Sequence, residues 1–524
     1  MGFVIGVDIG TGGCRVLAFD EKASVVASAK EEYPTFIPRP GWAEQDPEQI
    51  YQAVARALRR CLDEEPLRKA GSKAIDGVAF DGVLHSVIVG RPTGELITRA
   101  ITWADLRADG EARLLKRQMD ADEFYRRTGC PIHPMYLPAK LLWLQNHVLG
   151  SENPRSYRFF SLKEYVLYRL TGRWLVDWSV ASGTGLLNLA TLRWDHKILD
   201  RLGVRAEEFS EPVSPLAVVE GITAEAAAET GLPRHVRVVV GAADGPVSNL
   251  GYGVVDKRSM TLTIGTSGAV RTTSDQPLLD PAGRTWCYYL AADRWVPGGA
   301  TNNGGNVLTW LKDAVFGAQC EGSGPETRGG AGTSFEDLNA AAASVPAGSD
   351  GLLFLTFLAG ERCPGWNPQA RGVLFGLNLS HGKAHIVRAA LEGAVFQLYG
   401  SYSSLTQLSG VPEEIIASGG FTRSDVWLQI AADIFGHELI IPEQTEGSAF
   451  GVAALARVAL GQWPDLEVVR DFVQVKRRIA PNPVAHRRYM ELYEQYEAVY
   501  QALSPQFAAI ADLQNGGRHA MQQW

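Results

Sequence analysis

The feature that most constrains the fold of this chain is a glycine-rich turn that occurs twice. Residues 4–20 read VIGVDIGTGGCRVLAFD, and residues 259–275 read SMTLTIGTSGAVRTTSD. In each stretch an apolar run leads into a Gly/Thr/Ser turn and a second apolar run follows, which is typical of two strands joined by a tight turn. The two copies lie about half the chain apart. The sequence therefore predicts two related domains, each beginning with this hairpin.

Length and composition restrict the class of protein. A chain of 524 residues predicts roughly two to four domains. The formal net charge is −8 and the Lys and Arg residues are scattered, so we expect no nucleic-acid partner. No apolar stretch reaches ~18 residues and no leader pattern opens the chain, so we expect no membrane partner and a cytoplasmic location. None of the 6 cysteines forms a C-x-x-C pair, so we expect reduced thiols.

Local patterns predict alternating strands and helices. We expect strands over residues 3–9, 15–19 and 24–29, and a further strand over 75–82. Residues 46–61 carry a capping Asp46, a proline at the first helical position and apolar residues at helical spacing, so they predict a helix. This alternation is typical of an α/β architecture.

The first turn does not fit the common nucleotide loops. A Rossmann fingerprint needs a third glycine where this chain has Arg15, and it needs a helix where this chain continues with Val16, Leu17 and Ala18. The Walker pattern G-x-x-x-x-G-K-[ST] is absent from the sequence.

A turn between two strands can still bind phosphate. Glycines such as Gly12 and Gly265 let backbone N–H groups converge on an anion, Thr11 and Thr266 add hydroxyl donors, and Arg15 adds charge. Asp8 would repel a phosphate unless a cation lay between them, so its position predicts Mg²⁺. The alternative for Asp8 is that it caps the turn by accepting backbone N–H bonds.

Two further glycine clusters have the composition of a nucleotide site. Gly419 and Gly420 join an expected strand to a helix that starts at Ser424, which either cradles part of a nucleotide or is a plain connection. Residues 297–310, PGGATNNGGNVLTW, include Gly305 and precede a helix. They are too polar and glycine-rich for a core and suggest another face of the same cleft.

Asp244 is the candidate general base. It follows an apolar strand in VRVVVGAADG, flanked by small residues only, so a ligand can reach it. A carboxylate in that setting can accept a hydroxyl proton during phosphoryl transfer. The alternative is a turn-forming Asp.

Taken together, these stretches resemble the FGGY carbohydrate kinases, within the superfamily of hexokinase and actin. The most specific match is GVLFGL at 372–377, followed after seven residues by HIVRAALE at 385–392; KLLWLQN at 140–146 is similar to the N-terminal signature. The resemblance implies two related ribonuclease H-like domains, 1–243 for the sugar and 244–524 for the nucleotide, with a catalytic cleft between them. The last helix (487–504) would pack on the N-terminal domain or on a partner.

The resemblance also implies residue roles. Asp8 would lie near Mg²⁺, Asp244 would be the catalytic base, and ATP would be the phosphate donor. Residues expected at the nucleotide are Thr11, Gly12, Arg15, Gly265, Thr266, Gly305, Gly419, Gly420 and Ser424. Residues expected at the sugar are His85, Trp103, Asp105 and Arg107, together with Asp244. A packed core aromatic is the alternative for Trp103.

Within the family, the stretches ITWAD, FYRRTGCPIHPM and LPAKLLWL are most similar to gluconokinases. This implies conversion of D-gluconate to 6-phosphogluconate. A homodimer is a candidate assembly, which the sequence by itself does not determine. A cation would face the gluconate carboxylate, and the candidates are Arg107, His133, Lys140 and Lys163. Xylulose, ribulose or another polyol is the alternative substrate, and a non-catalytic sensor of sugar or nucleotide is the alternative function.

Two stretches depart from the family pattern. Gly12-Gly13-Cys14 replaces positions that usually bear hydroxyl groups, so backbone groups would have to hold the phosphate there. Asp81 stands where relatives tend to carry Ser or Gln, and a carboxylate near an anionic sugar would be unfavourable without a cation or water between them.

Overall fold

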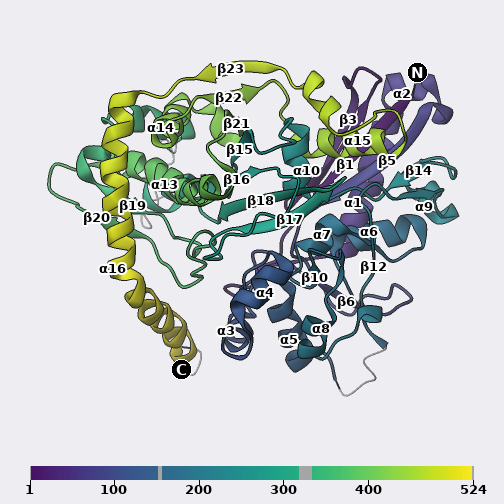
Figure 1. Cartoon of the computed structure of the whole chain (residues 1–524), viewed down its shortest axis with the longest axis horizontal. Coiled ribbons are helices and arrows are strands. Elements are labelled where there is room, and N and C mark those ends of the chain that lie inside the picture. Colours follow the sequence, from purple (N-terminus) through teal and green to yellow (C-terminus); the bar gives the residue numbers. More distant parts are fainter. Residues whose placement is uncertain (1, 151–155, 318–332, 522–524) are drawn as a thin grey trace, which may run out of the picture.

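The computed structural model describes residues 2–150, 156–317 and 333–521. Its two largest β-sheets lie side by side, with helices around and between them (Figure 1). Short strand pairs decorate the two halves: β4 (Glu44–Gln45), β6 (Ile88–Gly90), β7 (Ala100–Ile101), β8 (Arg158–Phe160), β9 (Leu175–Asp177), β10 (Leu187–Asn188), β11 (Arg193–Trp194), β12 (Glu211–Val213), β19 (Leu353–Leu355) and β20 (Val373–Phe375).

The first sheet has the order β13-β14-β5-β1-β2-β3. The first two strands form the predicted antiparallel hairpin, in which Ile9 pairs with Cys14, and β1 runs parallel to β5 on its other side. The bounds are β1 (Phe3–Ile9), β2 (Gly13–Phe19), β3 (Val25–Glu32), β5 (Ile75–Gly82), β13 (Val218–Glu220) and β14 (Arg237–Val239).

The second sheet has the order β17-β18-β16-β15-β21-β22-β23. Its hairpin is again antiparallel, with Ile264 paired to Gly268, and β15 runs parallel to β21. The bounds are β15 (Ser259–Ile264), β16 (Gly268–Thr272), β17 (Trp286–Ala291), β18 (Arg294–Thr301), β21 (Glu414–Ser418), β22 (Leu439–Pro442) and β23 (Val475–Ile479).

The two sheets match strand for strand from β3-β2-β1-β5-β14-β13 to β18-β16-β15-β21-β22-β23, with β17 added at one edge. Each therefore combines an antiparallel hairpin with parallel strands beside it. The predicted repeat of a hairpin-led α/β unit is confirmed, because a duplicated turn in sequence has become a duplicated sheet.

The helices of the N-terminal half follow the local signals in the sequence. The helix predicted at 46–61 is α1 (Pro47–Asp63), and the Asp46 side chain caps it by accepting from the backbone N–H groups of Glu48 and Gln49. The others are α2 (Glu65–Ala70), α3 (Asp109–Gln118), α4 (Ala121–Thr128), α5 (Leu137–His147), α6 (Leu162–Thr171), α7 (Trp178–Ser182), α8 (His196–Leu202), α9 (Ala224–Thr230) and α10 (Asp244–Gly251).

The helices of the C-terminal half are α11 (Gly305–Trp310), α12 (Phe335–Ala343), α13 (Lys383–Ser409), α14 (Asp425–Phe435), α15 (Gly447–Ala459) and α16 (Pro483–Met521). The last helix runs along the outer edge of this half (Figure 1). It contributes Tyr489, Leu492, Tyr496 and Phe507 to the core formed by β15, β21, α13 and α14. The expected helix at 487–504 thus packs on the C-terminal half.

One helix crosses between the halves. Although α15 follows β22 in the chain, its buried residues pack in the core around β1 and β5, and it lies on α10. The two helices touch through glycines: a methyl group on Gly251 would lie 1.8 Å from the carbonyl oxygen of Gly447, and one on Gly451 would lie 2.0 Å from that of Val247. Only glycine permits this approach of two backbones.

The stretch 297–310 differs from the expectation that it is too glycine-rich for a core. Residues 297–301 are buried in β18. Gly298 lies against the Trp286 ring and Gly299 against Ser401, so these glycines make room for large neighbours inside the sheet. The helix expected after them begins at Gly305.

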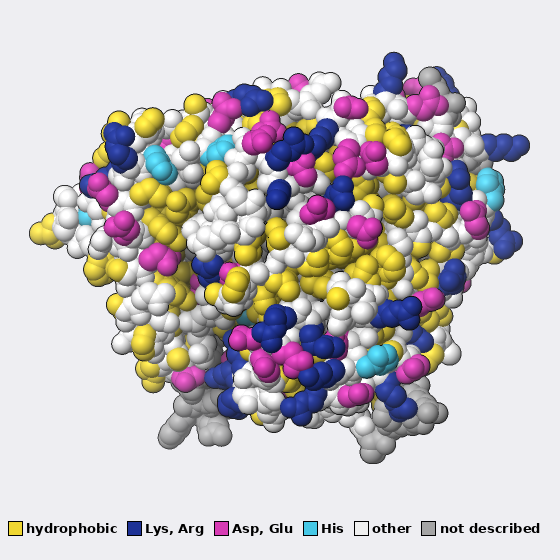
Figure 2. All heavy atoms as spheres, viewed as in Figure 1, with side chains coloured by type: hydrophobic (Ala, Val, Ile, Leu, Met, Phe, Trp, Pro, Cys, Tyr) yellow, Lys and Arg dark blue, Asp and Glu magenta, His cyan; other side chains and the backbone are white. Residues whose placement is uncertain are grey.

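On the face shown in Figure 2, positive and negative side chains are interspersed. No helix in the described ranges is both long and apolar enough to cross a membrane. The cysteines that the structure describes are all buried and form no disulfide with one another.

Candidate active site

Three neighbouring parallel strands of the first sheet bring carboxylates to one edge. Ile9 of β1 pairs with Gly82 of β5, and Gly82 in turn bridges to Ala243, which follows β14. Asp8, Asp81 and Asp244 therefore lie at the ends of adjacent strands. The carboxyl ends of parallel strands are the usual place for a ligand in such sheets.

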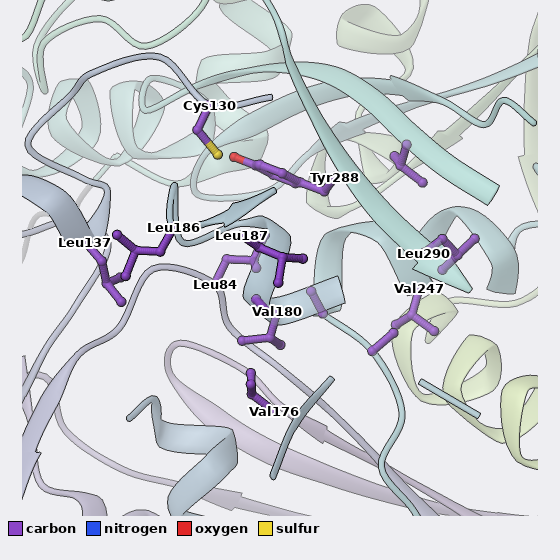
Figure 3. Close-up of a cluster of buried hydrophobic side chains, with 14 of the residues drawn as sticks. Leu84, Cys130, Leu137, Val176, Val180, Leu186, Leu187, Val247, Tyr288 and Leu290 are labelled. Atoms are coloured by element: carbon purple, nitrogen blue, oxygen red, sulfur yellow. The ribbon is translucent and has the colours of Figure 1, made fainter. Parts of the chain in front are cut away.

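A cavity of about 150 Å³ lies beside this edge, between the two halves of the chain. The first half contributes Thr11, Val83, Leu84, His85, Trp103 and Asp244, and the second contributes residues including Thr263, Ser267, Arg271, Trp286, Tyr288 and Arg362. Figure 3 shows the buried cluster that contains two of the lining residues, Leu84 and Tyr288, together with Val180, Leu187 and Val247. The cavity combines hydrogen-bonding groups with aromatic rings, as a sugar site requires.

Asp244 is the first residue of α10, and its carboxylate accepts the Gly245 backbone N–H at 2.6 Å. Burial raises the pKa of Asp244, while the positive charges of Arg271 and Arg362 and the Gly245 bond oppose that rise. A half-buried carboxylate at the cavity wall, kept available to ionise by two arginines, is suited to accept a proton from a bound hydroxyl.

Asp8 and Asp81 form a buried pair on β1 and β5. Burial raises the pKa of Asp8 to about 6, and burial together with the Asp8 charge raises that of Asp81 well above its ordinary value. Arg15 lies 3.9 Å from Asp8 and 2.8 Å from Glu446, so its charge is shared with the segment before α15. Both carboxylate oxygens of Asp81 are buried without a hydrogen-bond partner.

These carboxylates fit a divalent cation. A buried carboxylate with no partner, facing a second one, lacks the positive charge that a bound cation would supply. No group of three or more His, Cys, Asp or Glu able to hold a metal occurs in the described ranges. A pair is still sufficient for Mg²⁺, which is usually held by one or two carboxylates, waters and substrate phosphates.

The first turn holds Thr11 at the cavity. Its hydroxyl accepts from the Trp103 indole N–H at 3.2 Å, and its carbonyl accepts from the buried Gln45 side chain at 2.6 Å. A methyl group on Gly12 would touch nothing within 4 Å, so the backbone at Gly12 is open to a ligand. The turn closes through the Gly10 N–H, which donates to the Gly13 carbonyl at 3.0 Å.

The second turn is closed by the Gly265 N–H, which donates to the Ser267 carbonyl at 2.8 Å, and the start of α11 also lies against it. The backbone N–H of Gly305 donates to the Gly265 carbonyl at 2.7 Å, and that of Gly304 donates to the Thr266 carbonyl at 3.2 Å. Gly265 itself faces open space. Gly305 therefore supports the turn, and the backbone N–H and carbonyl of Gly265 are both hydrogen-bonded within the protein, to Ser267 and Gly305.

Gly419 and Gly420 follow β21, the strand parallel to β15, so they lie near the second turn. Gly419 has a φ of +95° and approaches the backbone of Ile264, while Gly420 faces open space. The Ser424 side chain caps α14 and donates to the Asn339 side chain at 2.9 Å. The hydroxyl of Ser424 is thus engaged within the protein.

His85 lines the cavity, and its own backbone is strained. Its φ is 65°, in the region that disfavours side chains. Its ring Nδ1 lies 2.7 Å from the Gly183 carbonyl, and Lys140 donates to the carbonyls of His85 and Thr102 at 2.6 and 2.7 Å. Burial and the Arg362 charge lower the pKa of His85, which makes it a neutral ring.

The structure does not bring Asp105 and Arg107 into the cavity. Asp105 is fully buried and accepts from the Ala43 backbone at 2.6 Å and from Arg107 at 2.7 Å, while Arg107 lies 3.7 Å above the Trp42 ring. They fasten the loop that carries Trp103. A W-x-D-x-R pattern places residues of one loop together in sequence, but only Trp103 points to the cavity.

Sequence reasoning missed two charged residues that line the cavity. Arg271 stands in β16 among Thr and Val, and Arg362 stands in a loop after β19. An Arg three residues after Gly268 was a usable signal, because the first turn also has an Arg two residues after Gly13. The position of Arg362 had no such signal, since its contacts come from distant segments.

Comparison with known proteins adds to this geometry. The N-terminal domain of the FGGY family of carbohydrate kinases matches residues 3–251, and the C-terminal domain of the same family matches residues 260–460. This chain belongs to the FGGY family of carbohydrate kinases. The resemblance inferred from the motifs and the two-domain α/β fold are confirmed, and the enzyme class follows from the family.

Individual relatives cover nearly the whole chain. A gluconokinase of Bacillus subtilis (strain 168) is 37% identical over 515 residues, 98% of each chain. The crystal structure of gluconate kinase from Lactobacillus acidophilus superposes with a TM-score of 0.88 at 33% identity, over 97% of this chain and 99% of that one. A ligand-bound xylulose kinase from the same species has a TM-score of 0.87, also at 33% identity, over 97% and 100%.

Proposed function

We propose that this FGGY kinase transfers the terminal phosphate of ATP to a sugar acid, D-gluconate, giving 6-phosphogluconate. The observation that carries the proposal is the placement of Asp244 beside two arginines at a cavity walled by both halves of the chain. The carboxylate supplies a base, and the arginines suit an anionic substrate. The similarity to gluconokinases supports the same substrate.

Asp244 would accept the proton of the primary hydroxyl as that oxygen attacks the phosphorus. In-line phosphoryl transfer depends mainly on positioning and on charge stabilisation. His85, held through its Nδ1 and neutral, has its Nε2 left to bind a sugar hydroxyl. Closure of the two halves around the cavity would exclude water from the reacting groups.

Asp8 and Asp81 would hold a divalent cation, Mg²⁺ in our proposal. When bound, Mg²⁺ neutralises charge on phosphate oxygens. Thr11, the open backbone at Gly12 and the second turn at Gly265 and Thr266 would bind phosphate oxygens. Arg15, Gly305, Gly419, Gly420 and Ser424 stay predictions for the nucleotide, with Gly305 and Ser424 supporting the backbone around it.

Activity on a panel of substrates tests this function. We expect ADP release with gluconate to exceed that with xylulose, ribulose, glycerol and erythritol by at least about 10-fold in kcat/KM. A preference for xylulose or ribulose would refute gluconate as the substrate and would leave the proposed kinase activity standing. Nucleotide binding without turnover of any sugar would refute the kinase activity and support the alternative function, a non-catalytic sensor.

Asp244→Asn tests the base. We expect kcat to fall by about 10²–10⁴-fold, because the amide cannot take the proton, while nucleotide affinity measured by calorimetry changes little. Asp275→Asn, at an exposed position, is the matched control and should keep full activity. An active Asp244→Asn enzyme would refute the assignment.

We also propose a cytoplasmic location, because the reaction consumes ATP. Assembly into a homodimer stays a prediction. The side chains of Leu374, Phe375, Leu377 and Leu379 are exposed along and after β20. Sedimentation of the full chain would measure its mass, and a monomer at all concentrations would refute the dimer.

A further inference from the structure

A gluconate site needs a cation for the carboxylate, and the four cations expected from sequence are engaged elsewhere. Arg107 is paired with Asp105 at 2.7 Å and with Glu44 at 2.8 Å. Lys163 lies 2.7 Å from Asp177 and donates to the Ala242 carbonyl at 2.8 Å. Turning either toward a substrate would break a buried ion pair, which is strongly unfavourable.

The other two are no better suited. The Lys140 ammonium group donates hydrogen bonds to two backbone carbonyls, and burial lowers its pKa to about 7. The Nδ1 atom of His133 accepts from the Met135 backbone at 3.2 Å, and burial lowers its pKa, so the ring is neutral. Neither side chain lines the cavity.

Two arginines do line the cavity, and each has a buried Nε without a hydrogen-bond partner. Arg271 lies against α10: a methyl group on Gly245 would be 3.4 Å from its Nε. Among the neighbouring charges, that of Arg271 lowers the pKa of Asp244 the most. A substrate carboxylate on Arg271 would place a second negative charge beside the base, so Arg271 is better assigned to Asp244.

Arg362 contributes less than Arg271 to lowering the pKa of Asp244, so a substrate carboxylate on Arg362 would disturb the base less. Its guanidinium lies 5.9 Å from the Trp103 ring centroid, and its charge lowers the pKa values of both His85 and His133, so it sets the positive potential at this part of the cavity. It forms no ion pair with any carboxylate in the described ranges, as the unpartnered Nε reflects.

The backbone on both sides of Arg362 is fixed. The Cys363 N–H donates to the Ala300 carbonyl of β18 at 3.0 Å. The Glu361 carboxylate accepts from the Gly365 N–H at 3.0 Å and from the Tyr500 hydroxyl of α16 at 2.5 Å. A guanidinium held on a fixed loop can bind an anion with little loss of conformational entropy.

We propose that Arg362 binds the carboxylate of the sugar acid and thereby selects an acid over a neutral sugar. This inference rests on the proposed function. A guanidinium can donate two parallel N–H bonds to a carboxylate, and these charge-assisted bonds are stronger than bonds to a neutral hydroxyl or amide. Arg362 is thus a specificity residue, distinct from Asp244 and its partner Arg271.

The test compares two ligands and two proteins. D-gluconamide has the carbon chain of D-gluconate without the charge, so KM is measured for both with wild-type enzyme and with Arg362→Gln. We expect the variant to raise the gluconate KM by about 10- to 100-fold and the gluconamide KM by less than about 3-fold. Arg362→Lys keeps the positive charge without the two parallel N–H donors, so its KM for gluconate should lie between those of wild type and Arg362→Gln. Binding of gluconate without nucleotide, measured by calorimetry, should weaken in parallel.

Arg294→Gln is the matched control. Arg294 is paired with Glu467 at 2.7 Å on β18, away from the cavity lining, so neither KM should change. Thermal unfolding shows whether each variant is folded, and if Arg362→Gln is not, the Arg362→Lys comparison of the two ligands decides.

The outcomes separate the two proposals. Wild-type enzyme that phosphorylates another sugar and not gluconate refutes the proposed function and this inference with it. Wild-type enzyme active on gluconate, with an unchanged ratio of the two KM values in folded Arg362 variants, overturns the role of Arg362 alone.

Discussion

At the scale of single residues, the carboxylates at the sheet edge differ in what surrounds them. Asp244 has two arginines and a backbone N–H to stabilise its charge. Asp81 faces Asp8, and the two carboxyl groups can hydrogen-bond only while one of them is protonated, so burial and this pairing both raise the pKa of Asp81. The concern that Asp81 would repel an anionic sugar is answered by position, because Asp81 is not among the residues lining the cavity.

This pair predicts an unusual pH dependence of stability. The pKa of Asp8 rises from 3.8 to about 6 on folding, so the folded chain binds more protons than the unfolded one between these values. The free energy of unfolding contributed by Asp8 is therefore lost as pH rises from about 4 to beyond 6. In Asp81→Asn the amide can donate to Asp8, so we expect a flatter profile and about 1–3 kcal/mol more stability at pH 7. Urea unfolding without divalent cations measures both.

Asp256→Asn is the control of opposite sign. Arg258 and Arg470 lower the pKa of Asp256 to about 2, so removing its charge should reduce stability at pH 7.

Added Mg²⁺ should stabilise the wild-type protein more than Asp81→Asn, because the variant lacks one proposed ligand. Equal stabilisation of both proteins would contradict the role of Asp81 at the cation.

At the scale of elements, the contact of α10 with α15 connects the base to both halves. Asp244 begins α10, and α15 lies across that helix at Gly251, Gly447 and Gly451. The orientation of α10, and therefore of Asp244, depends on this backbone contact. The closest approach of the two helices is made by glycines, so the periodicity of apolar residues in the sequence does not reveal it.

Gly451→Ala tests this contact. Its methyl group would lie 2.0 Å from the Val247 carbonyl oxygen, so the helices must separate. We expect a loss of about 1–3 kcal/mol in the free energy of unfolding by urea, together with a lower kcat. Gly110→Ala is a matched change in α3 with nothing within 4 Å, and it should be neutral or stabilise by up to about 1 kcal/mol. Equal stability of the two variants would refute the role of the contact.

At the scale of the whole molecule, the two halves share a core. Phe450, Val452 and Leu455 of α15 pack in one buried cluster with residues of β1, β5 and α10, and Trp286 and Tyr288 belong to that same cluster. The expected domain boundary between residues 243 and 244 stays a prediction. In this cluster, apolar side chains of each half are covered by side chains of the other half.

A polypeptide of residues 1–251 is therefore expected not to fold alone, because α15 would be missing from the face of β1 and β5. We expect it to lack a cooperative thermal transition and to bind a hydrophobic dye, whereas mixing it with residues 252–524 should restore the transition. A sharp transition for residues 1–251 alone would contradict the shared core.

Sequence reasoning succeeded where the signal is local. The hairpin at Ile9–Cys14, its copy at Ile264–Gly268 and the capped helix after Asp46 each depend on neighbouring residues, and the structure has all of them. The family motifs are also contiguous, so the kinase class could be predicted from them. Proximity in sequence misled only where residues of one loop diverge, as Asp105 and Arg107 do.

The sequence by itself determined the duplicated α/β fold, the kinase family and the position of Asp244 at a strand end. Only the tertiary structure decided which cations are free: Arg107, Lys140 and Lys163 are consumed by partners, while Arg271 and Arg362 face the cavity. The physical reason is that a charge is available only when no buried partner neutralises it, and those partners lie far away in the chain.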